Sequence, residues 1–177
     1  MNIWLKHARA ANGKHPVIGL ITLLLFMLVS GCENQLPTAR IGTPAPAFTL
    51  THLNGTMIQF PEHYRNKIVA IRFWADWCPF CKTEMADLEP VYRRYHDRGL
   101  VILAINVMQS PAEVRAFTER TGISYEVLLD SQGEVMRRYG VMGLPMTFIV
   151  DRHGIIKTRI AGESTADAFA SILDELL

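Results

Sequence analysis

The stretch RFWADWCPFCKTE, residues 72–84, lies at the junction between two kinds of sequence pattern. It overlaps the nearly continuous apolar run KIVAIRFWA (67–75), which is typical of a strand buried on both faces. From residue 79 to about 97, apolar side chains recur at the spacing of a helix. A second apolar run, LVILAINV (100–107), follows. The order of these segments predicts a strand–helix–strand unit with two cysteines at its first junction.

Outside this unit, turn and cap signals predict further strands and helices. Asn54-Gly55 separates two strand-like segments, 48–53 and 57–60, which indicates a β-hairpin. Ser110 to Glu113 reads as a capping box for a helix that ends at Gly122. The remaining expected elements are a strand at 125–129, a short helix to Tyr139, an antiparallel hairpin turning at Arg152–Gly154, and a final amphipathic helix with Ser164 as its N-cap. The sequence therefore predicts one α/β domain with a mixed sheet.

The composition argues against two classes of function. A formal net charge of +1 gives no reason to expect nucleic-acid binding. A structural zinc site needs four ligands at characteristic spacing, whereas the chain has three cysteines and scattered histidines. We therefore expect no metal, no cofactor and no nucleic-acid partner.

The first 46 residues read as an export signal followed by a tether. Residues 17–29, VIGLITLLLFMLV, carry no charge, follow several basic residues and precede Ser30-Gly31-Cys32. Because thirteen apolar residues are short for a membrane span, this pattern predicts a secretory signal peptide over 1–31. Residues 32–46 contain three prolines and little periodicity, which indicates a tether, and 47–177 form the folded domain.

The segment LVSGC, residues 28–32, resembles the lipobox of bacterial lipoproteins. The resemblance implies cleavage before Cys32 and attachment of lipid to its sulfur, and the alternative is an uncleaved signal anchor. Since two or more acyl chains anchor a protein stably, we expect a lipid-anchored domain outside the cytoplasm, facing the periplasm or the cell surface. The lipid would leave Cys78 and Cys81 as the only free pair.

Cys78 and Cys81 are spaced for thiol–disulfide exchange. Once a helix begins, residues three apart lie on one face, within reach of a disulfide. The N–H groups and dipole of a helix N-terminus favour a thiolate at Cys78, and the thiolate is the attacking species. We therefore expect Cys78 to act as nucleophile and Cys81 as resolving thiol. A permanent structural disulfide is the alternative, although closing so small a loop stabilises a fold weakly.

The segment FWADWCPFCK (73–82) resembles the active-site segment of the thioredoxin superfamily, and Gly143-Leu144-Pro145 resembles the cis-proline loop that faces its dithiol. The opening GTPAPAFTLTHLNG (42–55) and the run CKTEM (81–85) narrow the resemblance to the membrane-tethered TlpA/ResA branch. It covers about residues 40–177 and implies a thioredoxin-like mixed sheet flanked by helices, with an N-terminal β-hairpin extension.

The resemblance implies an extracytoplasmic thiol-disulfide oxidoreductase that exchanges disulfides with protein substrates, with reduction as the favoured direction. In this branch the targets include apocytochrome c during cytochrome c maturation, and electrons come from a membrane thiol transporter. We expect a monomer that binds protein thiols and disulfides and is held at a membrane by the lipid on Cys32.

Three other functions share part of these features. A redoxin-type thiol peroxidase has the fold and a similar opening, but its Pro-x-x-x-Thr/Ser-x-x-Cys pattern meets Ile71 and Ala75 before Cys78. A copper-delivery module of the Sco type needs three residues between its cysteines, and here there are two. A non-catalytic binding module leaves the Trp-Cys pair unexplained.

The resemblance also implies roles for residues around the dithiol. Glu84 matches a glutamate that borders the active site in ResA-like proteins, where a carboxylate can accept or return a proton, and a solvated helix glutamate is the alternative. The candidates for an apolar rim are Met142, Leu144 and Phe80. The residues expected to contact substrate are Trp77, Leu144 and Pro145, and those expected to tune the redox potential are Pro79, Phe80 and Arg72.

Two departures from the family pattern carry predictions. Arg72 stands where thioredoxins have an acidic residue and many relatives have Asn. Either its charge faces the dithiol and lowers the pKa of Cys78, or its head reaches solvent, which we favour. Ala86 replaces the helix-kinking proline expected five residues after Cys81, and Pro90 lies one turn later. We therefore expect a displaced bend or break at Pro90.

Overall fold

The computed structural model describes residues 39–177, so the predicted signal peptide and Cys32 lie outside the described residues. The strands are β1 (Phe48–His52), β2 (Met57–Phe60), β3 (Ile68–Trp74), β4 (Leu100–Val107), β5 (Glu126–Asp130), β6 (Met146–Val150) and β7 (Ile156–Ala161). The helices are α2 (Cys81–Tyr95), α3 (Pro111–Thr121), α4 (Glu134–Arg138) and α5 (Ala166–Asp174), with short 3-10 turns η1 (Glu62–Tyr64) and η2 (His96–Arg98). Each predicted strand is present within about two residues of its expected bounds.

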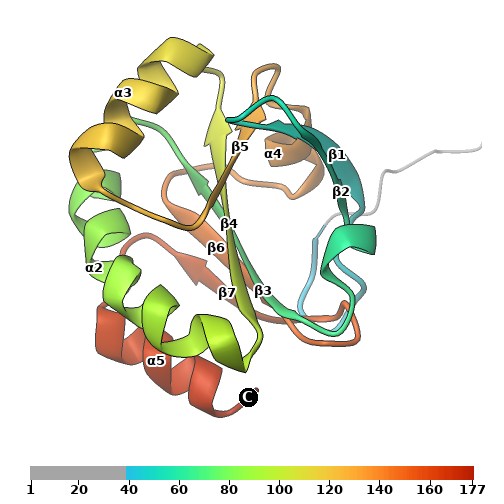
Figure 1. Ribbon diagram of the computed structural model, residues 1–177. Coiled ribbons are helices and arrows are strands. Elements are labelled where there is room, and N and C mark those ends of the chain that lie inside the picture. The colour runs from blue at the N-terminus through green and yellow to red at the C-terminus, as the bar shows by residue number, and fades with distance from the viewer. Residues whose placement is uncertain (1–38) are drawn as a thin grey trace, which may run out of the picture. The chain divides into compact units, whose positions relative to one another are not determined.

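The strands form one mixed sheet in the order β2-β1-β5-β4-β3-β6-β7 (Figure 1). β3, α2 and β4 make the expected strand–helix–strand unit, in which β3 pairs in parallel with β4. β6 runs antiparallel to β3, which places the start of β6 beside the carboxyl end of β3. The hairpin predicted at Asn54-Gly55 is confirmed, and its strand β1 joins the sheet through β5. The predicted mixed sheet with an N-terminal hairpin is therefore confirmed.

Alternate residues of β3 face two separate hydrophobic cores. Val69 and Ile71 belong to a core shared with the N-terminal hairpin and α4. Ile68 and Ala70 belong to the other core, under α2, α3 and α5, which lie together on one side of the sheet in Figure 1. Because both faces are covered, every residue of β3 is buried. The carboxyl end of this strand, where the cysteine motif begins, is therefore held between two packed layers.

Two helix starts bear on the cap predictions. At α3, Ser110 accepts the Glu113 N–H at 3.3 Å and the Glu113 carboxylate accepts the Ser110 N–H at 2.8 Å, which confirms the capping box. At α5, the prediction of Ser164 as N-cap is wrong, because the hydroxyl of Thr165 accepts a first-turn N–H at 3.2 Å. The backbone N–H of Ser164 donates instead to the carboxylate of Glu84 at 2.9 Å. A buried acid of α2 therefore holds the residue that precedes the N-cap of this helix.

Helix α2 runs without interruption from Cys81 to Tyr95, with Pro90 in its interior, so the predicted break is wrong. Proline lacks the N–H that would bond the carbonyl of Ala86, four residues earlier. Pro90 and Ala86 both lie on the exposed side of the helix, where water can bond that carbonyl. Leu88 on the opposite side is fully buried, and its packing holds the helix together across the missing bond.

Residues 39–46, which we expected to belong to the tether over 32–46, pack on the folded domain. Gly42 and Ala45 donate backbone hydrogen bonds of 2.8 and 2.9 Å to the β6–β7 hairpin. Ala39 and Ala45 are buried in one of the cores. Pro44 and Pro46 hide this pairing from sequence analysis, since they interrupt the alternation by which a strand is recognised. Within residues 39–177, no helix is long and apolar enough to cross a bilayer.

Candidate active site

Cys78 and Cys81 form a disulfide just beyond the carboxyl end of β3, with Cα atoms 5.4 Å apart. Two backbone bonds of 3.2 Å shape the connection, from the Cys78 N–H to Ala75 and from the Cys81 N–H to Cys78. The prediction that the two thiols lie within bonding reach is confirmed. Helix α2 begins at Cys81, however, so Cys78 precedes the helix N-terminus at which we placed it.

The two sulfur-bearing residues differ in access. Cys78 is 2% exposed, whereas Cys81 is fully buried in the core beneath α2. Both cysteines are buried in the oxidised protein, and Cys78 is the one that keeps some exposed surface. This difference favours Cys78 as the residue that exchanges with a partner and Cys81 as the one that acts within the chain.

A proline loop lies at the same end of the sheet as the disulfide. The peptide bond between Leu144 and Pro145 is cis. The next residue, Met146, opens β6 and pairs with Phe73 near the end of β3. Leu144 packs on the apolar cluster that contains both cysteines. The structure thus brings the proline loop, distant in sequence, to the strand end from which Cys78 follows.

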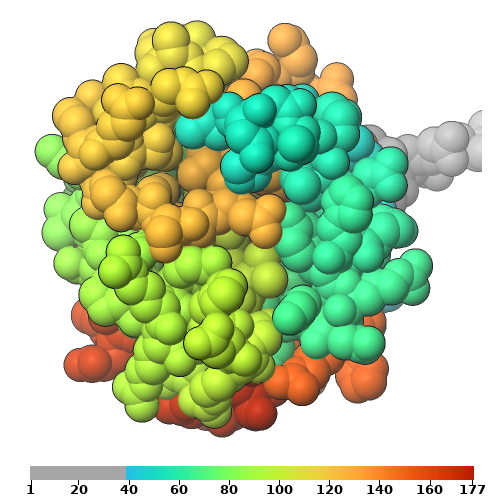
Figure 2. Space-filling model, in the orientation of Figure 1, coloured from blue at the N-terminus to red at the C-terminus, as the bar shows by residue number. Residues whose placement is uncertain are grey.

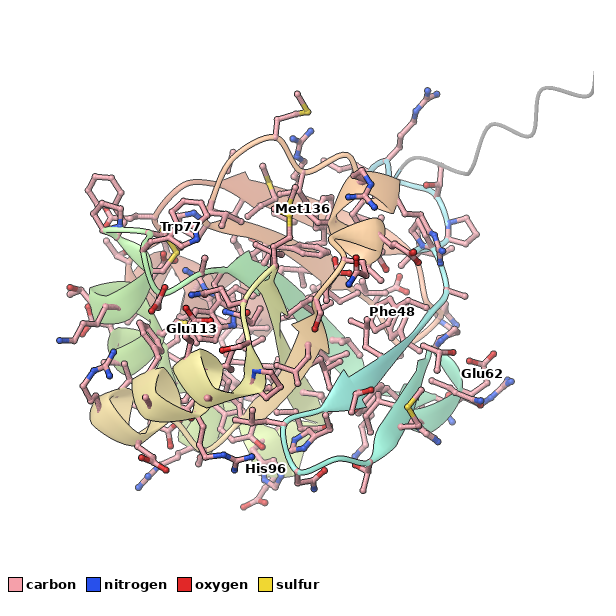
Figure 3. All side chains as sticks on the ribbon, turned by 90° about the horizontal axis from the view of Figure 1, so that it is seen from above. Phe48, Glu62, Trp77, His96, Glu113 and Met136 are labelled. Atoms are coloured by element: carbon pink, nitrogen blue, oxygen red, sulfur yellow. A yellow bond between two sulfur atoms is a disulfide. The ribbon has the colours of Figure 1, made fainter. Side chains whose placement is uncertain are left out.

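Exposed apolar side chains gather at this end of the molecule. Trp77 is 65% exposed, Phe80 54% and Met142 94%, and Met108 in the loop after β4 adds a fourth at 55%. Within residues 39–177 these are four of the six large apolar residues that are exposed. Figure 3 shows Trp77 projecting at the edge of the molecule. We call Trp77, Phe80, Met108 and Met142 the apolar rim, and Leu144, which we expected to belong to it, is half-buried. No sequence pattern pointed to Met108, because a single methionine after a strand fits no motif.

Arg72 and Glu84 form a buried ion pair between β3 and α2. Their side chains are 1% and 3% exposed. Nη1 of Arg72 donates to Oε1 of Glu84 at 2.9 Å and Nη2 contacts the other carboxylate oxygen, so the pair is joined at two points. The expectation that Arg72 carries its head to solvent is wrong, as is the alternative of a solvated Glu84. Arg72 lies on the face of β3 that α2 covers, and Glu84 supplies a carboxylate there.

Two further hydrogen bonds extend the ion pair across the site. Nη1 of Arg72 donates to the hydroxyl of Thr147 at 2.9 Å, two residues after Pro145. Oε1 of Glu84 accepts the backbone N–H of Ser164 at 2.9 Å. Buried charges are tolerated when they are paired and hydrogen-bonded in this way. The network connects the cysteine-bearing helix with the strand that follows the proline loop.

A polar cluster missed by sequence reasoning fixes the backbone just before Trp77. Oε1 of Gln109 accepts the Asp76 N–H and the side-chain N–H of Asn106, both at 2.8 Å. The amide nitrogen of Gln109 also contacts the Asp76 carboxylate. The cluster bridges the loops that follow β3 and β4. Its members are about 30 residues apart and match no spacing motif, so only the folded chain brings them together.

Pro79 and Phe80, the dipeptide between the cysteines, are both exposed. A partner that reaches Cys78 therefore meets this turn as well as Trp77. Within the described part of the chain, no group of three or more His, Cys, Asp or Glu residues is placed to hold a metal ion. The site consists of the disulfide, the proline loop, the apolar rim and the buried ion pair.

Comparison with known proteins agrees with this geometry. Residues 41–159 match the AhpC/TSA family. The thiol-disulfide oxidoreductase ResA of Geobacillus kaustophilus is 35% identical over 157 residues, which cover 89% of this chain and 90% of the relative. The chain belongs to this thioredoxin-fold family, in its TlpA/ResA-like branch. ResA of Geobacillus thermodenitrificans is 32% identical with the same coverage.

Two solved structures of similar proteins have the same fold. A thiol:disulfide interchange protein of the thioredoxin family from Chlorobium tepidum has a TM-score of 0.70 and 25% identity, covering 78% of this chain and 99% of that one. StoA from Bacillus subtilis has a TM-score of 0.63 and 25% identity, covering 73% and 97%. The thioredoxin-like fold is confirmed, and the chain, like its ResA relatives, is a thiol-disulfide oxidoreductase.

Proposed function

We propose that the protein is an extracytoplasmic enzyme that reduces disulfides in protein substrates through Cys78 and Cys81. The observation that carries the proposal is the disulfide just beyond the end of β3, in which Cys78 is 2% exposed and Cys81 is fully buried. A purely structural disulfide would not account for the apolar rim that surrounds it, because exposed apolar patches usually mark interaction sites. The activity in the name of the ResA relatives supports exchange as the reaction.

The reaction moves two electrons and two protons. In the reduced protein, the Cys78 thiolate attacks one sulfur of a substrate disulfide, which forms a mixed disulfide and releases the other substrate sulfur as a thiolate that takes up a proton. Cys81 then loses its proton and attacks Sγ of Cys78. This step reforms the Cys78–Cys81 disulfide and releases the second substrate thiol. A membrane thiol transporter supplies the two electrons and two protons that reduce the enzyme again.

Trp77, Leu144 and Pro145 hold the substrate polypeptide in this proposal. Trp77 supplies exposed apolar surface next to Cys78, and the half-buried Leu144 precedes the buried Pro145 at the same end of the sheet. The apolar rim favours substrates that are unfolded and carry apolar side chains beside their cysteines. Apocytochrome c during cytochrome c maturation is a substrate of this kind.

Glu84, Arg72 and the dipeptide Pro79-Phe80 adjust the dithiol. Glu84 follows Cys81 by three residues, so its carboxylate lies on the same helix face as the resolving thiol. Arg72 cancels that negative charge, which would otherwise oppose thiolate formation. Pro79 has no N–H and so offers no hydrogen bond to a thiolate at Cys78.

The protein is anchored outside the cytoplasm by lipid on Cys32, with residues 1–31 removed as a signal peptide. The uncharged run over 17–29 and the Gly31-Cys32 step support this part of the proposal. Globomycin, which blocks the lipoprotein signal peptidase, should cause a precursor to accumulate. The variant Cys32→Ser should remain unprocessed by that enzyme.

The activity is tested by reduction of insulin or apocytochrome disulfides in a Cys32→Ser background, with a dithiol as reductant. We expect the protein to accelerate the reaction and the additional change Cys78→Ser to abolish it. Hydrogen peroxide consumption with the same dithiol tests the redoxin-type peroxidase, which the AhpC/TSA match makes the second candidate. Peroxide consumption without disulfide reduction would overturn the proposal, and loss of both activities would indicate a binding module.

A further inference from the structure

A hollow of about 290 Å³ lies at the end of the sheet opposite the disulfide. Two segments line it: 60–69, of which all but 62, 63 and 68 contribute, before and at the start of β3, and 150–154 at the end of β6. Figure 2 shows the teal-green and orange surfaces of these segments meeting at the lower right. A seven-residue strand is about 23 Å long, so nearly the full length of β3 separates the hollow from the cysteine motif. In Figure 3, Trp77 and Glu62, which lies within the first segment, are on opposite sides of the molecule.

The lining of this hollow is basic. Arg65, Lys67, Arg152 and His153 contribute to it, and we call these four residues the basic pole. Within residues 39–177, none of the four forms an ion pair with a carboxylate. Asp151 is the one acid in the lining, and its carboxylate already accepts two backbone N–H groups of its own turn, at 2.9 and 3.0 Å. Arg65, Lys67 and Arg152 outnumber this one negative charge, so the lining is net positive and its local field attracts anions.

The N-terminal segment of the domain lies directly beside the basic pole. Ala45 donates to the carbonyl of Gly154, which itself lines the hollow, at 2.9 Å. Gly42 donates to Ile156 at 2.8 Å, on the strand that follows. Only seven residue steps separate Ala39 from Cys32, which allows a reach of at most about 25 Å. A lipid on Cys32 would therefore keep this end of the domain close to a membrane surface.

We propose that the basic pole docks the domain onto the anionic phosphate headgroups of the membrane to which it is tethered. The inference rests on the proposed lipid anchor. Cationic side chains beside a membrane anchor gain affinity for anionic lipid, each adding a modest increment that salt screens. Two features indicate that the basic pole binds a membrane: its positive charge, and the N-terminal segment, which leads to the proposed lipid anchor and lies beside it.

Docking by the basic pole orients the active site. The hollow and the cysteine motif lie at opposite ends of β3, so a domain seated on its basic pole holds Cys78 and the apolar rim away from the lipid. The apolar rim then faces the aqueous space, where soluble polypeptides approach, and does not insert into the bilayer. The arrangement separates two surfaces with different partners, one for lipid headgroups and one for substrate.

The test uses residues 32–177 with the change Cys32→Ser, since the described residues contain the complete sheet and both cores. Binding is measured by co-sedimentation with vesicles of phosphatidylcholine alone or with added phosphatidylglycerol, at low and high salt. The variant Arg65→Gln/Lys67→Gln/Arg152→Gln removes three charges from the pole. The control Arg115→Gln/Arg120→Gln/Arg137→Gln removes three exposed charges elsewhere.

We expect salt-sensitive binding to the anionic vesicles only. Each charge removed from the pole should weaken it about fivefold, so the triple variant binds about a hundredfold less tightly while the control binds nearly as the parent does. The proposal would be overturned by equal binding to neutral vesicles or by equal losses of binding in the two triple variants. Release of the protein by millimolar inorganic phosphate would also overturn it, because that result would indicate a soluble anion as the ligand. Insulin reduction in the same samples reports on the dithiol separately.

Discussion

Arg72 of β3 is joined at two points to Glu84 of α2, and both side chains are almost completely buried. The cost of burying each charged side chain is offset by the opposite charge of the other. Neither residue therefore acts on the dithiol independently. Thr147 and the backbone of Ser164 add hydrogen bonds, so the pair connects α2 to the strand that begins at the proline loop. This relationship leads to two predictions, one on stability and one on the thiols.

The first prediction concerns the stability of the ion pair. Arg72→Met leaves the carboxylate of Glu84 buried without its counter-charge and should lower the free energy of unfolding by about 3–5 kcal/mol at neutral pH. The double variant Arg72→Met/Glu84→Leu removes both charges and should recover most of that loss. Urea unfolding of the oxidised proteins measures both effects. A double variant less stable than Arg72→Met would show that the loss comes from packing and not from charge.

The second prediction concerns the reduced dithiol. Arg72→Asn leaves a negative charge near Cys81 and should raise the pKa of Cys78, whereas Glu84→Gln leaves a positive charge and should lower it. The double variant should titrate close to the parent protein. Each unit of pKa increase should make the redox potential more negative by about 30 mV. Thiolate absorbance and equilibration with glutathione provide the measurements, and titrations unchanged in both single variants would remove Arg72 and Glu84 from redox tuning.

The third prediction concerns the apolar rim. Met142→Ser removes the most exposed apolar side chain of the rim and should raise KM for insulin roughly three- to tenfold while leaving kcat nearly unchanged. Met57→Ser is the matched control, because Met57 is 57% exposed on β2, outside the rim. Steady-state kinetics separates the two constants. The same KM in both variants would mean that substrate does not contact Met142.

The fourth prediction concerns the pH dependence of stability at Glu89. Burial raises the pKa of this carboxyl, but hydrogen bonds from Ser124 and Arg93 outweigh burial and bring the pKa below its ordinary value. Because the pKa of Glu89 is lower in the folded protein than in the unfolded chain, its carboxylate stabilises the fold at pH values above the pKa of the unfolded chain. This contribution is lost as the pH falls through the pKa of the folded protein. Glu89→Gln should therefore cost about 1–2 kcal/mol at pH 7 and much less at about pH 3. Urea unfolding at the two pH values measures this cost. An equal cost at both would refute the claim that the ionised carboxylate of Glu89 stabilises the fold.

Local patterns predicted the elements whose causes lie within a few residues. The hairpin at Asn54-Gly55 and the capping box at Ser110 are set by turn and cap chemistry. The strand–helix–strand unit follows from two apolar runs around a helical period. The cysteine pair was recognisable because both members lie on one turn. For these features the sequence contains nearly all the information that the fold uses.

Features that depend on distant partners were beyond such patterns. The burial of Arg72 could not be predicted, because the sequence of its own strand does not indicate the carboxylate of Glu84 that α2 places beside it. Ser164 and Thr165 are both good cap residues, and the choice between them depends on the bond from Ser164 to Glu84, 80 residues away. Gln109 meets Asp76 only because β3 and β4 are parallel neighbours.

The most direct measurement is the capture of the mixed disulfide with a substrate protein. In a reduced Cys32→Ser background, Cys81→Ser keeps the attacking thiol but lacks the resolving one, so it should accumulate a covalent adduct that a small dithiol releases. Cys78→Ser should form little adduct, because Cys81 is fully buried. Adducts formed equally well by Cys78→Ser, or by neither variant, would contradict the assignment of Cys78 as the nucleophile.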